Sequence, residues 1–152
     1  MFQKMKYLRA CITESFRLYP TADRIARHTE VDLEVTGGYI LPKMSLVFCH
    51  HRTAAWREEN FTRADAFVPE RWIEGLCDPT WRREQTLVRP FGFGKRACPG
   101  RKLAETELYI TIAKIFQSFH VDLLDDLSVE FNFLLSPTGP LRLLLTPRDD
   151  EN

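Results

Sequence analysis

Two stretches of the chain carry apolar residues at the spacing of an α-helix. The first runs from about Phe2 to Leu18, contains no proline or glycine, and stops just before Pro20. Its apolar side chains fall on two opposite stripes, one with Met5, Leu8, Ile12 and Phe16 and the other with Tyr7, Ala10, Cys11 and Leu18. Two apolar faces predict a helix that is buried within a larger structure. The second helix is predicted from Arg101 to Phe119, and its inner side is expected to carry Leu103, Ala104, Leu108, Ile112, Ile115 and Phe116.

The region after the first helix has the alternation of β-structure. Extended chain is predicted from Ile25 to Val35, where apolar residues alternate with charged ones. Gly37 and Gly38 predict a turn, and further short strands are predicted at Tyr39–Leu41 and Leu46–Phe48. We therefore expect a small antiparallel sheet in this part of the chain.

The rest of the chain is patterned less regularly. A short helix is predicted from Thr53 to about Glu59, whereas Asn60 to Arg89 shows no sustained period. A loop this long within a domain is usually functional, so we expect a packed, meandering segment there. Beyond the second helix, strands are predicted at Val121–Leu124 and Val129–Leu135, with Leu141–Leu145 as the return strand of a hairpin that turns at Ser136–Pro140.

Composition and charge exclude some classes of protein. The 152 residues are 44% hydrophobic and 28% charged, which is ordinary for one globular domain or part of one. Because 21 basic and 21 acidic side chains balance, no net field draws the chain to nucleic acid or to an anionic membrane. No apolar run is long enough to span a bilayer, and we expect any membrane anchor or targeting segment to lie outside these residues.

The four cysteines show no Cys-x-x-Cys spacing, so neither a zinc site nor a disulfide framework is expected. Three of them, Cys11, Cys49 and Cys77, are expected to be packing or surface residues. The fourth, Cys98, lies in the run Pro-Phe-Gly-Phe-Gly-Lys-Arg-Ala-Cys-Pro-Gly, directly ahead of the second helix. A thiolate that binds metal must stay reduced, which fits an intracellular site better than a secreted one.

The run that ends in Cys98 has the features of a ligand-binding loop. Gly92 and Gly94 allow positive-φ turns and the close approach of a flat ligand. Pro99 is predicted to be the first helical residue, so that Cys98 caps the helix and its sulfur is favoured as an anion by the helix dipole. Arg96 can bind a carboxylate through two hydrogen bonds. By residue type alone Cys98 would be a small buried apolar residue, but this loop favours a metal ligand.

Residues Phe91 to Gly100 resemble the Phe-x-x-Gly-x-Arg-x-Cys-x-Gly loop of the cytochrome P450 family, the haem-thiolate monooxygenases. The resemblance implies haem b (iron protoporphyrin IX), with the thiolate of Cys98 as the axial ligand of the iron. It also implies haem contacts from Phe91, Gly92, Gly94, Arg96, Cys98 and Gly100 and, as a second propionate-binding arginine, Arg27. A solvated strand arginine is an equally open interpretation of Arg27.

Glu14 and Arg17 have the spacing of an ordinary surface helix pair, yet Glu14 falls within an apolar stripe, which predicts burial. The segment also resembles the Glu-x-x-Arg helix of the same family. That resemblance implies a hydrogen-bonded triad with an arginine of a downstream Pro-Glu-Arg segment, here Arg71. The triad is expected to hold the loop that carries the cysteine and to be structural rather than catalytic.

The resemblance covers nearly the whole chain but corresponds to about the C-terminal third of such an enzyme. We therefore expect an α+β chain, mainly helical with small antiparallel sheets and a meandering loop, forming one partial domain over residues 1–152. The implied function is monooxygenation of a lipophilic substrate with O2 and two electrons, with the fragment inactive alone. Two alternatives stay open: a haem-thiolate isomerase or haem-binding protein without an external electron donor, and a truncated, non-functional product.

The stretch Gly100 to Glu105 resembles the basic version of this sequence in mitochondrial members of the family. This implies a ferredoxin-type electron donor, with a flavoprotein reductase as the alternative. It implies the matrix side of the mitochondrial inner membrane, with the endoplasmic reticulum membrane as the alternative. An acidic donor would dock on Arg9, Arg101 and Lys102, although Thr13 stands where those relatives usually carry a lysine.

Overall fold

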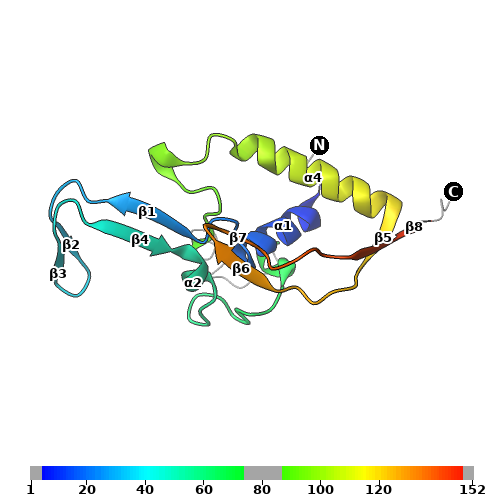
Figure 1. Ribbon diagram of the computed structural model, residues 1–152, viewed down its shortest axis with the longest axis horizontal. Coiled ribbons are helices and arrows are strands. Elements are labelled where there is room, and N and C mark those ends of the chain that lie inside the picture. The colour runs from blue at the N-terminus through cyan, green and yellow to red at the C-terminus, as the bar shows by residue number, and fades with distance from the viewer. Residues whose placement is uncertain (1–4, 74–86, 149–152) are drawn as a thin grey trace.

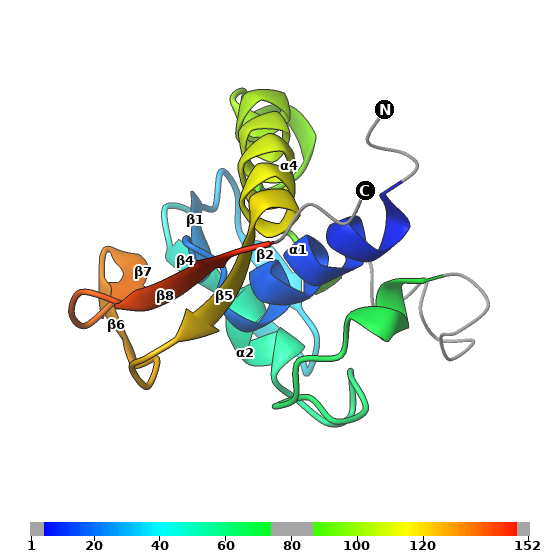
Figure 2. The same cartoon turned by 90° about the vertical axis from the view of Figure 1, so that its right-hand side faces the viewer.

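The computed structural model describes residues 5–73 and 87–148. Helix α1 (Lys6–Leu18) lies at the centre of the molecule, and helix α4 (Arg101–Ser118) lies along one side of it (Figures 1 and 2). Pairs of short antiparallel strands flank the helices. The predicted mixture of helices and small antiparallel sheets is confirmed.

Both apolar stripes of helix α1 contain buried residues. It ends at Leu18 because Pro20 cannot continue the helix, and the amide of Tyr19 bonds to the carbonyl of Ser15 at 2.7 Å. The buried residues are Ala10, Ile12, Glu14, Arg17 and Leu18. Burial of the charged pair is therefore confirmed. The predicted burial of both stripes holds at Ile12 in the first and at Ala10 and Leu18 in the second, but not at Tyr7, which is 56% exposed.

The first four strands form two separate pairs instead of one sheet. The pairs are β1 (Arg24–His28) with β4 (Leu46–His50) and β2 (Leu33–Val35) with β3 (Tyr39–Leu41). They extend as an arm away from the helices (Figure 1). The predicted continuous extended stretch is broken at Thr29, whose hydroxyl donates to the carbonyl of Pro42 at 2.6 Å and whose amide bonds to the carbonyl of Ser45 at 3.0 Å. Gly37 (φ 92°) and Gly38 (φ 76°) make the predicted turn.

The short helix after this arm differs from its predicted bounds. Helix α2 spans His51–Ala55, so it begins two residues before Thr53 and ends four residues before Glu59. Both ring nitrogens of His51 are buried without a hydrogen-bond partner among the described residues. A 3-10 helix, η2 (Pro69–Trp72), follows in the meandering segment. Cys77, which the sequence suggested as a packing or surface residue, lies outside the described residues.

A small apolar cluster lies beneath α1. Its fully buried members are Ala55, Phe61 and Ala64, and partly buried side chains packed against it are Trp72, Leu87 and Val88. The cluster thus joins α2 and the meander to the residues that lead into the cysteine loop.

Helix α4 matches the predicted helix to within one residue, but its predicted inner side is not buried. Leu103 is 73% exposed and Phe116 is 52% exposed, and no described residue of α4 is buried. Within the described chain α4 contacts chiefly α1 and strand β5 (Phe119–Leu123). Periodicity identified the helix correctly, but the described residues leave much of its apolar surface exposed.

The predicted C-terminal hairpin is wrong in its partners and in the position of its turn. Strand β6 (Val129–Asn132) pairs with β7 (Leu134–Pro137), and the chain reverses at Phe133 instead of at Ser136–Pro140. Strand β8 (Leu143–Pro147) pairs with β5, which continues directly from α4. Phe133 has φ 68°, a left-handed conformation that a phenylalanine side chain does not signal in the sequence. The run 129–135 consequently looked like one strand.

Candidate functional site

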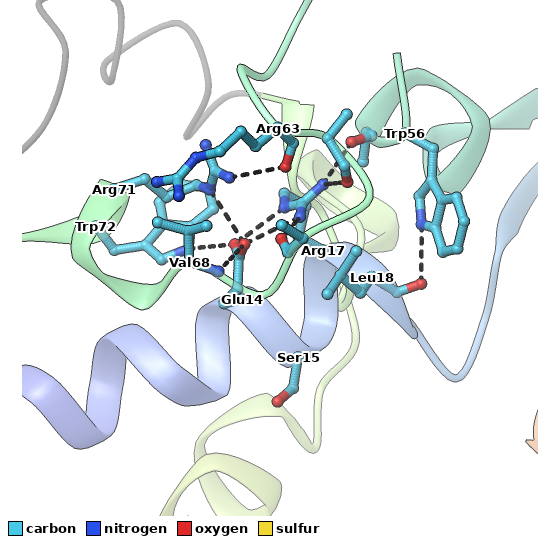
Figure 3. A network of polar contacts seen from close by, with 12 residues as sticks. Glu14, Ser15, Arg17, Leu18, Trp56, Arg63, Val68, Arg71 and Trp72 are labelled. Atoms are coloured by element: carbon cyan, nitrogen blue, oxygen red, sulfur yellow. Dashed lines mark hydrogen bonds and ion pairs between the residues drawn. The ribbon is translucent and has the colours of Figure 1, made fainter. Parts of the chain in front are cut away.

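Glu14 lies at the centre of a buried polar network beneath α1 (Figure 3). Its carboxylate is fully buried and accepts two hydrogen bonds from Arg17, from Nε to Oε2 and from Nη2 to Oε1, each at 2.9 Å. Arg71 of η2 donates from Nε to Oε1 at 3.1 Å. The structure therefore brings together the three side chains that the sequence suggested as a triad.

Two further donors complete the shell of Glu14. The amide of Val68 donates to Oε1 at 2.9 Å, and the indole N–H of Trp72 donates to Oε2 at 2.8 Å (Figure 3). Sequence reasoning missed both. The backbone donor has no sequence signal, whereas Trp72 directly follows Arg71 and could have been suspected from that position. Glu14 thus accepts five hydrogen bonds.

The guanidinium of Arg17 ties the downstream segment to α1. Its Nη1 donates to the carbonyls of Ala55 at 2.8 Å and Ala64 at 2.6 Å, and its Nη2 donates to the carbonyl of Ala66 at 2.9 Å. Arg71 adds a bond from Nη2 to the carbonyl of Arg63 at 3.3 Å. Because all these partners are on α2 and the meander, the network holds that whole region against the helix.

The pKa of Glu14 is lowered from its ordinary value. Burial by itself raises this pKa, because it disfavours the charged carboxylate. The hydrogen bonds from Arg17, Val68 and Trp72, together with the positive charge of Arg17, outweigh that effect. Glu14 is therefore a carboxylate at neutral pH, with its charge matched inside the fold.

Phe61 connects this network to the cysteine loop. Its fully buried ring lies beneath both guanidinium groups, 5.2 Å from the carbon of Arg17 and 5.9 Å from that of Arg71. Val88 packs against the apolar cluster around Phe61 and directly precedes the stretch Arg89–Pro90. The buried ion network and the start of the cysteine loop thus share one core.

The cysteine loop is closed by its own backbone. Gly92 (φ 68°) and Gly94 (φ 66°) take the predicted left-handed conformation, which only glycine adopts freely. The amide of Cys98 donates to the carbonyl of Phe91 at 2.8 Å, which draws the two ends of the loop together. Cys98 is exposed and forms no disulfide. The loop therefore presents a free thiol at the surface of this chain.

Cys98 is not the N-cap of the helix that follows. The N-cap of α4 is Gly100 and the first helical residue is Arg101, so the prediction that Pro99 opens the helix is wrong. One extra turn lies between the thiol and the helix, closed by the amide of Arg101 on the carbonyl of Cys98 at 3.4 Å. A Cβ atom at position 100 would lie 3.9 Å from the sulfur, so glycine leaves the space beside it open.

Two arginines were predicted to bind carboxylates near the thiol. Arg96 ends the 3-10 helix η3 (Gly94–Arg96), two residues from Cys98, and is exposed. Arg27 is exposed on β1, and its Nη1 donates to the carbonyl of Ala26 at 2.7 Å. No hydrogen bond or ion pair among residues 5–73 and 87–148 links Arg27 to the cysteine loop.

A cavity of about 480 Å³ opens between α1, α4 and the start of the cysteine loop. The aromatic side chains Phe16, Trp72 and Phe91 are among its lining residues. The cationic residues of its lining are Lys6, Arg9, Arg89 and Arg101. The single acidic residue of the lining is Glu105, which forms an ion pair with Arg101 at 2.8 Å.

Two of the three predicted docking residues lie in the lining of this cavity. Arg9 of α1 and Arg101 of α4 line the same cavity although they are far apart in the sequence. Lys102 is exposed but does not line it. The structure therefore places two of the three predicted residues together, and the pairing of Arg101 with Glu105 reduces its free charge.

The exposed Cys98 thus ends a glycine loop directly ahead of a long helix, and the residues leading into that loop pack on the core beneath the Glu-Arg-Arg network. The family model of cytochrome P450 matches residues 1–146. The chain belongs to the cytochrome P450 family, whose cofactor is haem b bound through a cysteine thiolate. The resemblance drawn from the sequence is confirmed.

Relatives and a solved structure agree with this assignment. Ecdysone 20-monooxygenase of Drosophila melanogaster is 40% identical over 144 residues, covering 93% of this chain and 26% of that protein. The mitochondrial 1,25-dihydroxyvitamin D(3) 24-hydroxylase of Mus musculus is 35% identical over 152 residues, covering 96% and 28%. A crystal structure of a cytochrome P450 (CYP102L1) matches with a TM-score of 0.82 and 32% identity, covering 97% of this chain and 33% of that one.

The chain thus spans about a quarter to a third of the length of the proteins it matches. None of the helices that the structure describes is both long enough and apolar enough to cross a membrane.

The donor set around Cys98 fits haem. The described residues contain no group of three or more His, Cys, Asp or Glu side chains that could hold a metal ion. Haem brings four nitrogen ligands of its own to the iron, so a single protein thiolate such as that of Cys98 suits it. The exposed thiol, the open space beside it and the nearby Arg96 suit such a flat, dianionic group.

Proposed function

We propose that this protein is the haem-binding part of a cytochrome P450 monooxygenase and that Cys98 is the axial thiolate ligand. The observation that carries the proposal is the free, exposed thiol of Cys98 at the end of a left-handed glycine loop, in a chain of this family. Bound haem supplies oxygen activation, because electron donation by the thiolate favours cleavage of the O–O bond. The chain's own residues hold the group and tune the sulfur.

Each loop residue has a distinct role in this proposal. Gly92 and Gly94 let the backbone approach the porphyrin, and Gly100 leaves room beside the sulfur. Arg96 binds one haem propionate through its guanidinium, and Arg27 is proposed for the second. The first ring of the loop, Phe91, packs near the thiolate and limits the access of water.

The network around Glu14 is proposed to be structural. Its three charged side chains are buried, and the single carboxylate of Glu14 faces two guanidinium groups whose remaining bonds go to backbone carbonyls. Its bonds to the meander hold the core on which Val88 and the cysteine loop rest. We therefore assign Glu14, Arg17 and Arg71 to the support of the haem site.

Haem titration tests the proposal. Added haem is expected to bind with the absorption of a thiolate complex, and carbon monoxide added after reduction is expected to give a thiolate-type difference spectrum. A stable spectrum supports the proposed ligand. The absence of any thiolate-type spectrum would favour the alternative hypothesis that the chain is a truncated, non-functional product. A haem-thiolate isomerase or a haem-binding protein without a donor would show the spectrum but no electron uptake from a redox protein.

Substrate and location are proposed from the relatives. A lipophilic substrate is proposed, because the relatives include an ecdysone 20-monooxygenase and a 1,25-dihydroxyvitamin D(3) 24-hydroxylase. Two relatives carry the word mitochondrial in their names. We therefore propose the matrix side of the mitochondrial inner membrane, with the endoplasmic reticulum as the alternative.

The electron donor is proposed to be an acidic ferredoxin. The cavity between α1 and α4 has four cationic lining residues and one acidic one, so its field attracts an acidic surface. Arg9 and Arg101 are proposed as the central contacts, with Lys102 on the adjoining surface. A flavoprotein reductase is the alternative donor.

The Arg9→Gln substitution is expected to slow association with an acidic ferredoxin about fivefold at low salt, because one charge pair in water is worth about 1 kcal/mol. The difference from the parent protein is expected to shrink as salt is added, since screening weakens exposed pairs. Stopped-flow or surface plasmon resonance measures the rate. Arg57, which is exposed and outside the cavity, provides the control Arg57→Gln. Equal slowing in both variants would contradict docking at this cavity.

A further inference from the structure

The ring of Phe91 is held between the two helices. Phe16 of α1 contacts it edge to face, with ring centroids 5.3 Å apart and the planes at 78°. Arg101 of α4 places its guanidinium carbon 5.8 Å from the centroid of the same ring. All three side chains line the cavity between α1 and α4. The ring of Phe91 is therefore in contact with both helices.

The backbone of Phe91 in turn holds Cys98. Its carbonyl accepts the amide hydrogen of Cys98 at 2.8 Å, the longest-range backbone bond within the loop. The next residue is Gly92, with φ 68°. Because glycine restricts its backbone angles little, it does not by itself fix the direction of the preceding carbonyl. The direction of the Phe91 carbonyl therefore depends on how its ring is packed. A displaced ring would move the acceptor of the Cys98 amide.

We propose that Phe16 and Arg101 are positioning residues for Cys98 and act through Phe91. Phe16 fixes the ring from α1, the helix whose position is set by the Glu14 network. Arg101 fixes it from the first turn of α4. The inference rests on the proposed role of Cys98 as the haem ligand and adds how the fold sets the place of that ligand. It assigns a role to Phe16, which sequence reasoning placed only in an apolar stripe.

Hydrogen exchange of the Cys98 amide tests the contacts of Phe16 and Arg101 with Phe91 without bound haem. In the full chain, the hydrogen-exchange rate of this amide is measured by NMR, relative to that of Ala104, whose amide bonds to the carbonyl of Gly100 at 3.0 Å. This ratio removes any general loosening of the fold. In Phe16→Leu, loss of the ring-to-ring contact is expected to raise the ratio about fivefold. Arg101→Lys, which keeps the charge but loses the planar group, is expected to raise it about twofold.

Two substitutions serve as matched controls. Phe16→Tyr keeps the aromatic ring and is expected to exchange like the parent. Phe48→Leu makes the same side-chain change on β4, where the ring contacts that of His50, and is expected to leave the ratio unchanged.

Three results would overturn the proposal: an unchanged ratio in Phe16→Leu, an equal change in Phe48→Leu, or a Cys98 amide that exchanges freely in the parent. A failure of haem to bind through Cys98 would be seen separately in the haem titration. The two proposals can therefore fail independently.

Discussion

The Cys98→Ser substitution is expected to abolish the thiolate-type carbon monoxide difference spectrum of the haem-loaded protein. A serine hydroxyl stays protonated at neutral pH and is a hard oxygen ligand, whereas the thiolate is soft and donates strongly to iron. The change removes no buried contact, because Cys98 is exposed. Absorption spectroscopy after reduction and addition of carbon monoxide measures the result. Urea denaturation of the haem-free chain is expected to show the same free energy of unfolding as in the parent protein.

The matched control is Cys49→Ser, at the other exposed free cysteine of the described chain. This residue lies on β4, in the arm of paired strands, and pairs with Ile25. Its replacement is expected to leave the spectrum intact. The same spectrum in Cys98→Ser as in the parent protein would end the assignment of Cys98 as the ligand.

The Glu14→Gln substitution is expected to lower the free energy of unfolding by about 3–5 kcal/mol, the usual cost of breaking a buried ion pair from one side. The guanidinium groups of Arg17 and Arg71 would remain buried without a counter-charge. The side-chain NH2 of glutamine would also stand where a carboxylate oxygen now accepts hydrogen bonds, so its N–H groups would face the N–H donors of the network. Equilibrium urea denaturation, followed by circular dichroism, measures the loss.

A surface pair provides the comparison for this loss. Glu105→Gln breaks the pair with Arg101, whose side chain is 58% exposed, and is expected to cost less than about 1 kcal/mol. The pKa of Glu14 lies below its ordinary value, so its stabilisation is present above the unfolded-state pKa and is lost as the pH falls through the folded-state pKa. Glu14→Gln is therefore expected to flatten the acid side of the stability profile. Equal losses in the two variants would contradict the buried network.

The sequence predicted best what depends on local periodicity. The bounds of α4 follow from spacing along one helix, and the burial of Glu14 follows from its place in an apolar stripe. The partners of Arg17 could not be predicted, because carbonyls such as those of Ala55 and Ala64 are brought in by long-range docking. Backbone acceptors carry no residue signature.

The errors have equally specific causes. A short apolar run identifies β8 as a strand, but it does not say whether β5 or β6 is the partner. The turn at Phe133 has a left-handed conformation, which a sequence usually signals by glycine or asparagine. At the cysteine loop, a proline after Cys98 suggested an early helix start, whereas Gly100 takes the N-cap and inserts a turn. Rules that use only local sequence therefore failed where a nearby residue or strand could take the same structural role.

The long sequence separations within the Glu14 network constrain how the chain folds. Arg17 bonds to carbonyls 38 and 47 residues away, and Glu14 bonds to the indole 58 residues away. Closing such loops costs entropy before any bond forms, and a half-assembled network would bury an unmatched charge. Helix α1 and the meander are thus expected to dock in a single cooperative step late in folding. A stable intermediate with only one of them in place is disfavoured.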